Sequence, residues 1–259
     1  MRQLELSGRE VQLWVVRLEA AEDNYALACS WLSADETERA GRFRFEKHRR
    51  AFVLGRGALR GLAASYLGMT PASVCFSYGP KGKPSLADLD NRLKFNVSNS
   101  GDLAAYAFTL GCEIGVDVEH RHRMLEIEGI ARRFFAAAEV EELMSLPESH
   151  QHDGFFNCWT RKEAYIKAIG EGLSVPLHSF QVTLRPGVAA RMVMLDGSAA
   201  AAECWKFHSF TPASDYSGAI AYRDRERPLI EHPLLTADEL LEPWRGVNLT
   251  AVGSPTRKD

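Results

Sequence analysis

The pattern of apolar and polar positions predicts a chain that mixes helices and strands. Apolar residues recur every three to four positions in several long segments, which is the spacing of an amphipathic helix. Short runs rich in branched and aromatic residues, bounded by turn residues, are typical of strands. The pattern predicts helices over residues 34–42, 46–67, 125–135, 137–146, 153–170 and 237–241. It predicts strands over residues 11–18, 74–78, 93–97, 103–110, 113–119, 180–184, 191–195, 205–210 and 216–221.

The order of these elements indicates an α+β fold made of two halves of similar plan. Strand, helices and strands follow one another once before Gly111 and once after it, although no residue-level repeat accompanies this order. We therefore divide the chain into two α+β subdomains, residues 1–110 and 111–225. Residues 226–259 form a C-terminal extension that is expected to be partly disordered, since its end is polar and rich in turn residues.

A meander is expected where the two halves join. The strands at 103–110 and 113–119 are separated by a short turn containing Gly111, so they are expected to pair with each other in antiparallel fashion. The polar residues 98–102, which follow the strand at 93–97, are expected to form a turn.

Composition and charge narrow the classes of protein. The net charge of -3 argues against a general nucleic-acid binder. The five cysteines are scattered and show no Cys-x-x-Cys spacing, so neither a zinc site nor a disulfide framework is indicated. The N-terminal residues lack the apolar core of a signal peptide, and no run is long enough to span a bilayer. These features predict a cytoplasmic protein with no membrane partner.

The segment 159–172 holds a carboxylate inside an apolar stripe. At 100° per residue, Glu163 shares a helix face with Phe155, Trp159 and Ile166, whereas the opposite face carries Arg161 among other residues. The helix is expected to end at Gly170, since glycine accepts the left-handed cap conformation. The simplest interpretation of Glu163 is a local ion pair with the lysine four residues later. A buried carboxylate otherwise needs another partner.

A second acidic pattern lies on a predicted strand. Asp117 and Glu119 are two residues apart, so both carboxylates leave the same face of the strand. A solvent-exposed strand face would explain an ordinary Asp-x-Glu pair. Together with Glu163, however, they form the oxygen ligand set that Mg²⁺ prefers, and Mg²⁺ normally also binds waters and substrate phosphates. Lys162 and Lys167 flank Glu163 and could neutralise such phosphates, so the pattern predicts a magnesium–pyrophosphate site.

Four short motifs also resemble, in order and spacing, those of one family. They occupy residues 82–84, 95–100, 115–119 and 159–167. Together they resemble the motif set of the 4′-phosphopantetheinyl transferases, specifically the long type related to the surfactin-synthetase activator (Sfp-like). The resemblance extends from about the first predicted strand to Ala221 and includes residues 132–135 and 170–176.

This resemblance implies an activity and a fold. Such an enzyme moves the 4′-phosphopantetheine group of coenzyme A onto a serine of an apo acyl, peptidyl or aryl carrier protein (holo-[acyl-carrier-protein] synthase activity) and releases adenosine 3′,5′-bisphosphate. The implied fold is a monomer of two similar α+β subdomains related by a pseudo-twofold axis, with coenzyme A between them.

The resemblance also implies roles for individual residues. Asp117, Glu119 and Glu163 match the family's magnesium ligands. Lys162 and Lys167 match its phosphate-contacting lysines, of which Lys167 is also expected to serve catalysis. Gly82, Lys83 and Pro84 match the loop that borders the adenine. Ser98 matches the segment that holds the 3′-phosphate.

One position departs from the family pattern. Asn99 stands where many members have a histidine that is thought to contact the 3′-phosphate. An asparagine donates a hydrogen bond but carries no charge. We therefore expect basic residues of the helix at 46–67, Arg49 or Arg56, to supply the missing positive charge.

The base that accepts the serine proton has two candidates. Glu139 aligns with a glutamate that is sometimes given this role in the family, and the alternative is a water held by Glu163. Glu139 also lies in the first turn of a predicted helix, where the helix dipole favours a glutamate without any catalytic role.

Two other functions would use the same sequence features. A magnesium-dependent nucleotide pyrophosphohydrolase would use the same acids with water in place of the serine. A non-catalytic carrier-protein-binding module would be expected to have lost the acids or the lysines, and this chain has all of them. The identity of the carrier protein is not indicated, but Arg132 or Arg133 and nearby apolar residues are expected to contact it, because carrier proteins are generally acidic.

Overall fold

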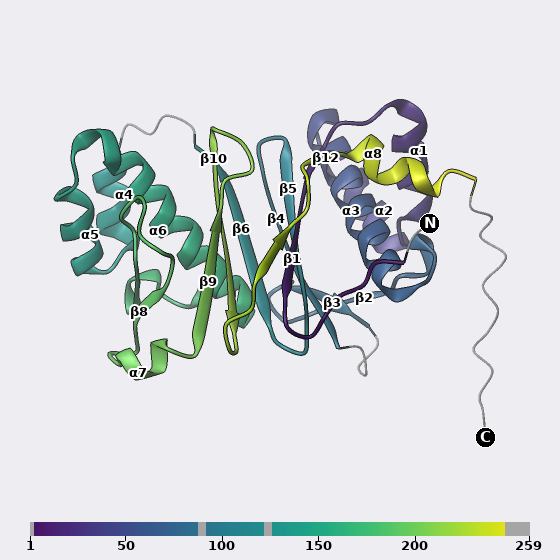
Figure 1. Ribbon diagram of the computed structural model, residues 1–259. Coiled ribbons are helices and arrows are strands. Elements are labelled where there is room, and N and C mark those ends of the chain that lie inside the picture. Colours follow the sequence, from purple (N-terminus) through teal and green to yellow (C-terminus); the bar gives the residue numbers. More distant parts are fainter. Residues whose placement is uncertain (1–2, 88–91, 122–125, 247–259) are drawn as a thin grey trace, which may run out of the picture. The chain divides into compact units, whose positions relative to one another are not determined.

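The computed structural model describes residues 3–87, 92–121 and 126–246 (Figure 1). The chain has the predicted α+β fold, and its residues group into two compact units. Unit 1 takes in the described residues of Met1–Glu5, Val16–Cys75 and Leu235–Asp259. Unit 2 takes in those of Leu6–Val15 and Phe76–Leu234. The predicted division after residue 110 concerns two structurally similar halves, which this grouping does not test, so it stays a prediction.

Unit 1 is mainly helical, and its long helix α3 is the element on which the others pack. The predicted helices at 34–42 and 46–67 are confirmed, whereas α1 was not predicted. Gly68 ends α3 in the left-handed conformation, with a φ of 65°. The α-helices of unit 1 are α1 (Glu22–Trp31), α2 (Ala34–Gly41), α3 (Glu46–Leu67) and α8 (Ala237–Leu241), with 3₁₀ turns at Pro71–Ser73 and Glu242–Trp244.

Residues of the predicted C-terminal extension belong to the folded core of unit 1. Helix α8 packs against α1 and α3. The side chain of Asp238 accepts hydrogen bonds from the backbone N–H of Ala21 and from the Asn24 side chain, at 3.0 and 2.6 Å. The part of the extension for which disorder was predicted, at the very end of the chain, lies outside the described residues.

Unit 2 contains two main sheets. In the first sheet the strand order is β11-β1-β5-β4. Strand β12 pairs with Val16 and Arg17 at the end of β1, and these paired residues belong to unit 1. In the second sheet the order is β6-β10-β9. The strands of the first sheet are β1 (Val11–Arg17), β4 (Leu93–Ser100), β5 (Leu103–Leu110), β11 (Leu229–Glu231) and β12 (Leu235–Thr236). Those of the second are β6 (Ile114–His120), β9 (Trp205–Phe210) and β10 (Tyr216–Arg223).

Two hairpins complete the strands of unit 2. One joins β2 (Phe76–Tyr78) to β3 (Pro84–Leu86), and the other joins β7 (Phe180–Val182) to β8 (Met192–Leu195). The turn of the first hairpin contains the Gly-Pro-Lys sequence of residues 79–81.

The expected meander is wrong. Strand β5 pairs with β1 on one edge and with β4 on the other, so it has no free edge for β6. Strand β6 instead begins the second sheet and pairs with β10 in antiparallel register, with Asp117 opposite Ala219 and Glu119 opposite Ser217.

The expected polar turn at 98–102 is also largely wrong. Strand β4 continues through Ser98 and Asn99 to Ser100, and only Gly101 and Asp102 form the turn. The polar residues continue the strand because their side chains find partners on β6, as described for the site below.

Helix α6 is the central helix of unit 2. It runs along the second sheet and packs against β6 and β10, while α4 and α5 lie against α6 (Figure 1). It begins at Glu148, earlier than predicted, and ends at Gly170 in the predicted left-handed cap, with a φ of 75°. The helices of this layer are α4 (Ile127–Phe134), α5 (Ala137–Met144) and α6 (Glu148–Ile169), with a short α7 (Ala199–Ala202) near β8.

Because α6 is covered on two sides, the predicted division into an apolar face and an opposite face fails. Arg161 was assigned to the opposite face, yet it is 2% exposed and its guanidinium donates to the carbonyl of Thr183 at 2.5 Å. The apolar face is confirmed for Phe155 and Ile166, which are both buried.

Strand β6 approaches helix α6 unusually closely at Gly115. A Cβ atom at this position would lie 2.0 Å from the carbonyl oxygen of Ala164 and 2.4 Å from the backbone nitrogen of Ala168. Any side chain there would therefore force the strand and the helix apart. This contact brings the acids of β6 next to the polar residues of α6.

Two of the sequence-based expectations concern the cysteines and membrane-spanning helices. The five cysteines are all free. No helix in the described ranges is both long and apolar enough to cross a bilayer.

Candidate active site on strand β6 and helix α6

The candidate site lies where β6 and α6 meet in unit 2. Asp117 and Glu119 come from β6, and Glu163 and Lys167 come from α6. Electrostatic interactions link Glu163 to Asp117, Glu119 and Lys167. The structure thus brings four of the predicted site residues together, from two segments that are far apart in the sequence.

Asp117 lies at the centre of this site. Its side chain is almost fully buried, and its Oδ1 accepts hydrogen bonds from Lys167 Nζ at 2.6 Å and from Ser98 Oγ at 3.0 Å. Lys167 Nζ also donates to Ser98 Oγ at 2.8 Å. The other carboxylate oxygen, Oδ2, is buried and has no hydrogen-bond partner among the described residues. Such an atom is costly to leave unsatisfied and marks a place where a ligand would be stabilised.

Glu119 is held from two sides. Its Oε2 accepts a hydrogen bond from Ser100 Oγ at 2.7 Å. Burial and the nearby Asp117 carboxylate raise the pKa of Glu119, while hydrogen bonds from the side chains of Ser100 and Trp159 and the charge of Lys167 lower it. The net shift is upward, so positive charge at the site is insufficient to offset burial and repulsion.

Glu163 shows the same imbalance more strongly. Burial and the charge of Asp117 raise the pKa of Glu163 to about 7, against the opposing effect of Lys167, and Glu119 raises it further. Among the residues that the structure describes here, three carboxylates therefore share one ammonium group, and the site would be stabilised by additional positive charge.

These residues fit a hard divalent cation. Carboxylate oxygens are the ligands that Mg²⁺ prefers, and the unpaired Asp117 Oδ2 offers one directly. Within the described ranges, however, no three His, Cys, Asp or Glu side chains are gathered closely enough to form a finished metal cage. The assignment of Asp117, Glu119 and Glu163 as magnesium ligands therefore stays a prediction.

The structure places Glu139 and Lys162 outside the group of acids, in a buried pair with each other. Lys162 Nζ lies 2.7 Å from Glu139 Oε2 and donates to the carbonyls of Leu177 and Phe180 at 2.7 and 2.6 Å. Glu139 also accepts backbone N–H groups of Ala136 and Val182, at 2.8 and 2.7 Å. Both side chains are fully occupied and almost completely buried. This environment supports a structural role rather than the predicted roles in base catalysis and phosphate contact.

The predicted adenine loop forms the turn of the β2–β3 hairpin. Gly82 has a φ of 81°, and Pro84 pairs with Tyr78 across the hairpin. Lys83 Nζ donates to the carbonyl of Ala168 at 2.8 Å and lies 3.0 Å from Glu113 Oε2. Burial lowers the pKa of Lys83, although Glu113 opposes the shift.

The hairpin borders a cavity of about 380 Å³ within unit 2. Lys83 and Pro84 of the hairpin line it together with Phe95, Gly170 and Glu171. Lys83 therefore ties the hairpin to the C-terminal end of α6, next to this cavity.

The residues expected to bind the 3′-phosphate belong to β4 in unit 2 and to α3 in unit 1. Ser98 is buried against Asp117, whereas Asn99 is exposed, because successive residues of β4 face opposite sides. Arg49 and Arg56 belong to α3 in unit 1, where Arg49 forms an exposed ion pair with Glu46 and Arg56 Nε lies 3.4 Å from Glu36 Oε1. Their role in phosphate binding stays a prediction.

Sequence reasoning missed two polar residues of the site. Ser100 and Trp159 both contact Glu119. Ser98 and Ser100 are two residues apart, as are Asp117 and Glu119. This repeated spacing was the signal in the sequence that two strands could face each other through these side chains. Interpreting residues 98–102 as a turn concealed it.

Two family models match parts of this chain. The model of the 4′-phosphopantetheinyl transferase superfamily matches residues 113–221, which include Asp117, Glu119, Glu163 and Lys167. The model described as 4′-phosphopantetheinyl transferase, N-terminal, matches residues 17–110.

Several relatives are similar over more than half of their own length. The 4′-phosphopantetheinyl transferase HetI of Nostoc sp. (strain PCC 7120) is 37% identical over 84% of this chain and 90% of its own. The 4′-phosphopantetheinyl transferase Sfp of Bacillus subtilis is 34% identical over 60% of this chain and 67% of its own. The human L-aminoadipate-semialdehyde dehydrogenase-phosphopantetheinyl transferase is 33% identical over 62% of this chain and 56% of its own. The chain therefore belongs to the 4′-phosphopantetheinyl transferase superfamily and is a 4′-phosphopantetheinyl transferase of the long, Sfp-like type.

Proposed function

We propose that this chain transfers 4′-phosphopantetheine from coenzyme A to a serine of an apo carrier protein in a magnesium-dependent reaction. The serine oxygen forms a bond to the phosphorus that carries pantetheine. The pyrophosphate bond of coenzyme A breaks, and adenosine 3′,5′-bisphosphate leaves with the bond electrons. The observation that carries the proposal is the group of Asp117, Glu119, Glu163 and Lys167 in a chain of this family.

Asp117, Glu119 and Glu163 would hold the magnesium ion. The ion would supply positive charge to neutralise the pyrophosphate oxygens. The support for these ligands is the unpaired Oδ2 of Asp117 and the excess of carboxylates over ammonium groups at the site. Ser98 and Ser100 orient two of the carboxylates through hydrogen bonds.

Lys167 is the better candidate for phosphate contact of the two predicted lysines. Its side chain is 29% exposed, whereas that of Lys162 is fully buried and bound to two carbonyls. Lys162 would have to leave Glu139 uncompensated in order to reach a substrate, which is costly for a buried charge. We therefore assign to Lys167 the stabilisation of charge on the departing bisphosphate.

Geometry also favours Glu163 over Glu139 for the proton transfer. Both oxygens of Glu139 already accept backbone N–H groups, and the side chain is buried. Glu163 is only half-buried and belongs to the acidic site. A general base has to come within hydrogen-bond reach of the proton that it accepts, directly or through one water. Glu163, or a water that it holds, therefore receives the serine proton in our proposal.

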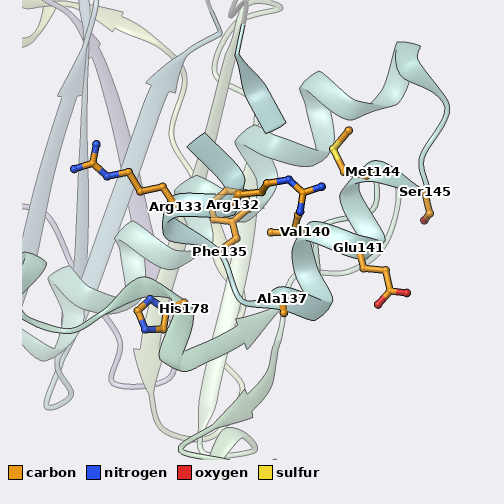
Figure 2. A pocket seen from close by; sticks show the side chains of 9 residues that line it. All are labelled: Arg132, Arg133, Phe135, Ala137, Val140, Glu141, Met144, Ser145 and His178. Atoms are coloured by element: carbon orange, nitrogen blue, oxygen red, sulfur yellow. The ribbon is translucent and has the colours of Figure 1, made fainter. Parts of the chain in front are cut away.

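We propose that the carrier protein binds a surface on helices α4 and α5. Helices α4 and α5 border a cavity of about 740 Å³ whose lining includes the apolar residues Phe135 and Val140 (Figure 2). Figure 2 shows Arg133 and His178 on one side of Phe135 and Glu141 on the other. The Arg133 guanidinium lies over the Phe134 ring, 5.1 Å from its centroid, and Arg132 forms an ion pair with Glu128. Arginines beside an apolar surface suit an acidic partner with exposed apolar residues.

The test incubates the full chain with apo acyl, peptidyl and aryl carrier proteins, coenzyme A and Mg²⁺. Intact-mass measurement should show a gain of about 340 Da on the carrier protein, and chromatography should show an equal amount of adenosine 3′,5′-bisphosphate. A carrier protein with alanine in place of the acceptor serine is the control, and EDTA should abolish the mass gain.

The outcomes separate the alternatives. Cleavage of coenzyme A with no change in the mass of any carrier protein would identify a pyrophosphohydrolase and overturn the proposal. Binding of carrier protein without any turnover would identify a non-catalytic module. Size-exclusion chromatography of the same sample tests the expected monomer.

A further inference from the structure

The turn between β4 and β5 is fastened to strand β10 by one tyrosine. The hydroxyl of Tyr216 donates to Asp102 Oδ1 at 2.6 Å and accepts from the backbone N–H of Asp102 at 3.2 Å. Gly101 adopts a φ of 59°, and a Cβ atom at this position would lie 2.4 Å from the Tyr216 hydroxyl oxygen. The contact therefore requires both a glycine in the turn and a hydroxyl on the tyrosine.

The contact between Tyr216 and Asp102 connects two sheets whose strands are not paired through backbone hydrogen bonds at this point. Strand β4 belongs to the first sheet of unit 2, and β6 and β10 belong to the second. The join between β4 and β6 consists of side chains instead. Asn96 Oδ1 accepts the backbone N–H of Val116 at 2.9 Å, and the hydroxyls of Ser98 and Ser100 donate to Asp117 and Glu119.

Ser100 is the last of these side chains and the one nearest the turn. Its hydroxyl oxygen accepts the backbone N–H of His120 at 3.1 Å, so its own proton is free to point at Glu119 Oε2, 2.7 Å away. The position of Ser100 depends on the end of β4, which Tyr216 holds at the next two residues. Burial and the hydrogen bond to Asp102 raise the pKa of Tyr216 to about 12, so its hydroxyl retains the proton that it donates.

We propose that Tyr216 is a positioning residue of the acidic site: by holding the turn at Gly101 and Asp102, it keeps Ser100 against Glu119. Tyr216 touches neither the acids nor any substrate group in this role and acts through Ser100. The inference rests on the proposed function, since the position of Glu119 affects catalysis only if Glu119 binds the metal. Hydrogen-bonding partners that orient metal ligands typically affect metal affinity about 10- to 100-fold.

The chain offers a closely matched control on the same strand. Tyr222 lies six residues after Tyr216, and therefore on the same face of β10. It is also buried, and its hydroxyl also holds a turn, by accepting the backbone N–H of Arg227 at 2.9 Å and donating to the carbonyl of Arg227 at 3.2 Å. Tyr222→Phe thus removes the same atom and similar hydrogen bonds without touching β4.

The experiment titrates the full chain with Mn²⁺, used as a paramagnetic substitute for Mg²⁺, and measures free Mn²⁺ by electron paramagnetic resonance. Tyr216→Phe should raise the Kd for Mn²⁺ about 3- to 10-fold, and Ser100→Ala about 10-fold. Ser100→Thr, which keeps the hydroxyl, should restore the affinity. The double variant should be no worse than Ser100→Ala, because both changes act on the same carboxylate. Tyr222→Phe should leave the Kd unchanged.

The transfer assay gives a second measurement. Tyr216→Phe should raise the Mg²⁺ concentration for half-maximal rate by a similar factor while kcat at saturating Mg²⁺ recovers, and thermal unfolding should show similar losses for Tyr216→Phe and Tyr222→Phe. If Tyr216→Phe leaves both metal measurements unchanged, or if Tyr222→Phe changes them equally, the positioning role is refuted. If the wild-type chain modifies no carrier protein, the proposed function fails instead, and this outcome is independent of the Tyr216 variant.

Discussion

Helix α6 carries two lysines, five positions apart, and each is paired with a carboxylate in a different way. Lys162 and Glu139 form a buried pair in which every polar atom has a partner within the protein. Lys167 and Asp117 form a pair of similar length, but the lysine is partly exposed and one oxygen of the aspartate lacks a partner among the described residues. Residue type therefore does not distinguish a structural pair from a candidate catalytic one. The two pairs differ in whether all their polar atoms already have partners or whether one of them is still available to a ligand.

The largest effect that this comparison predicts is on stability. Lys162→Met should lower the free energy of unfolding by about 3–5 kcal/mol, because it leaves the buried Glu139 carboxylate without its counter-charge. Lys167→Met, the same change on the same helix, should cost less, about 1–3 kcal/mol, because it leaves the buried Asp117 carboxylate without its counter-charge but at a site that solvent reaches through the partly exposed lysine. Denaturant unfolding measures both. Equal losses would show that the two pairs do not differ in the way described.

The next effect is on catalysis. Glu163→Gln should slow transfer about 100-fold, since it removes a charge from the acidic site where the substrate pyrophosphate would be bound. The folded state should be retained. Glu148→Gln, an exposed position at the start of the same helix, is the matched control and should transfer at the wild-type rate. A normal rate for Glu163→Gln in magnesium buffer would contradict its assignment as a metal ligand and base.

A smaller effect is expected on the pH dependence of stability in EDTA. The folded-state pKa of Glu163 is raised from 4.5 to about 7. Its stabilising contribution is therefore fully present below about pH 4.5 and is lost as the pH rises through 7. After allowance for partial exposure, the loss should be about 1 kcal/mol. Thermal unfolding at several pH values should show a steeper decline for wild type than for Glu163→Gln, and parallel curves would contradict the pKa shift.

The smallest effect concerns a third and more exposed ion pair, Arg49–Glu46 in unit 1. If Arg49 supplies the charge that Asn99 lacks, Arg49→Ala should weaken coenzyme A binding about fivefold, as expected for one exposed contact to a phosphate. The Arg49→Ala, Arg56→Ala double variant should weaken it further. Arg185→Ala removes an exposed arginine of unit 2 and controls for net charge. Calorimetric titration that gives unchanged affinity for the double variant would remove both arginines from the proposed phosphate site.

Local patterns predicted the parts of the site that depend on one element. The two-residue spacing of Asp117 and Glu119 placed both on one strand face, and Ser98 and Ser100 contact both from the opposing strand. Glycine at 170 correctly predicted the end of α6. The strand and helix assignments for β5, β9 and α8 match the structure residue for residue.

Features that depend on distant partners were not predictable in this way. Lys162 resembled Lys167 in the sequence, because nothing local indicates that Glu139, on another helix, would be its partner. The pairing of β6 with β10 rather than β5 depends on β5 already having β1 at its other edge, and β1 comes from the start of the chain. The polar sequence around Ser100 predicts a turn, but the residue extends β4, because its hydroxyl donates to Glu119 on a strand of a different sheet.

Gly115 allows the strand that carries Asp117 and Glu119 to lie close to helix α6. The backbones of strand and helix come so close there that only the hydrogen of a glycine fits between them. The absence of a side chain at this position therefore sets the distance between strand and helix. A design that places Asp117 and Glu119 on another scaffold would also need a glycine two residues before the aspartate. Without the glycine, the recipient strand would lie farther from its helix, and the two strand acids would lie farther from the acid on the helix.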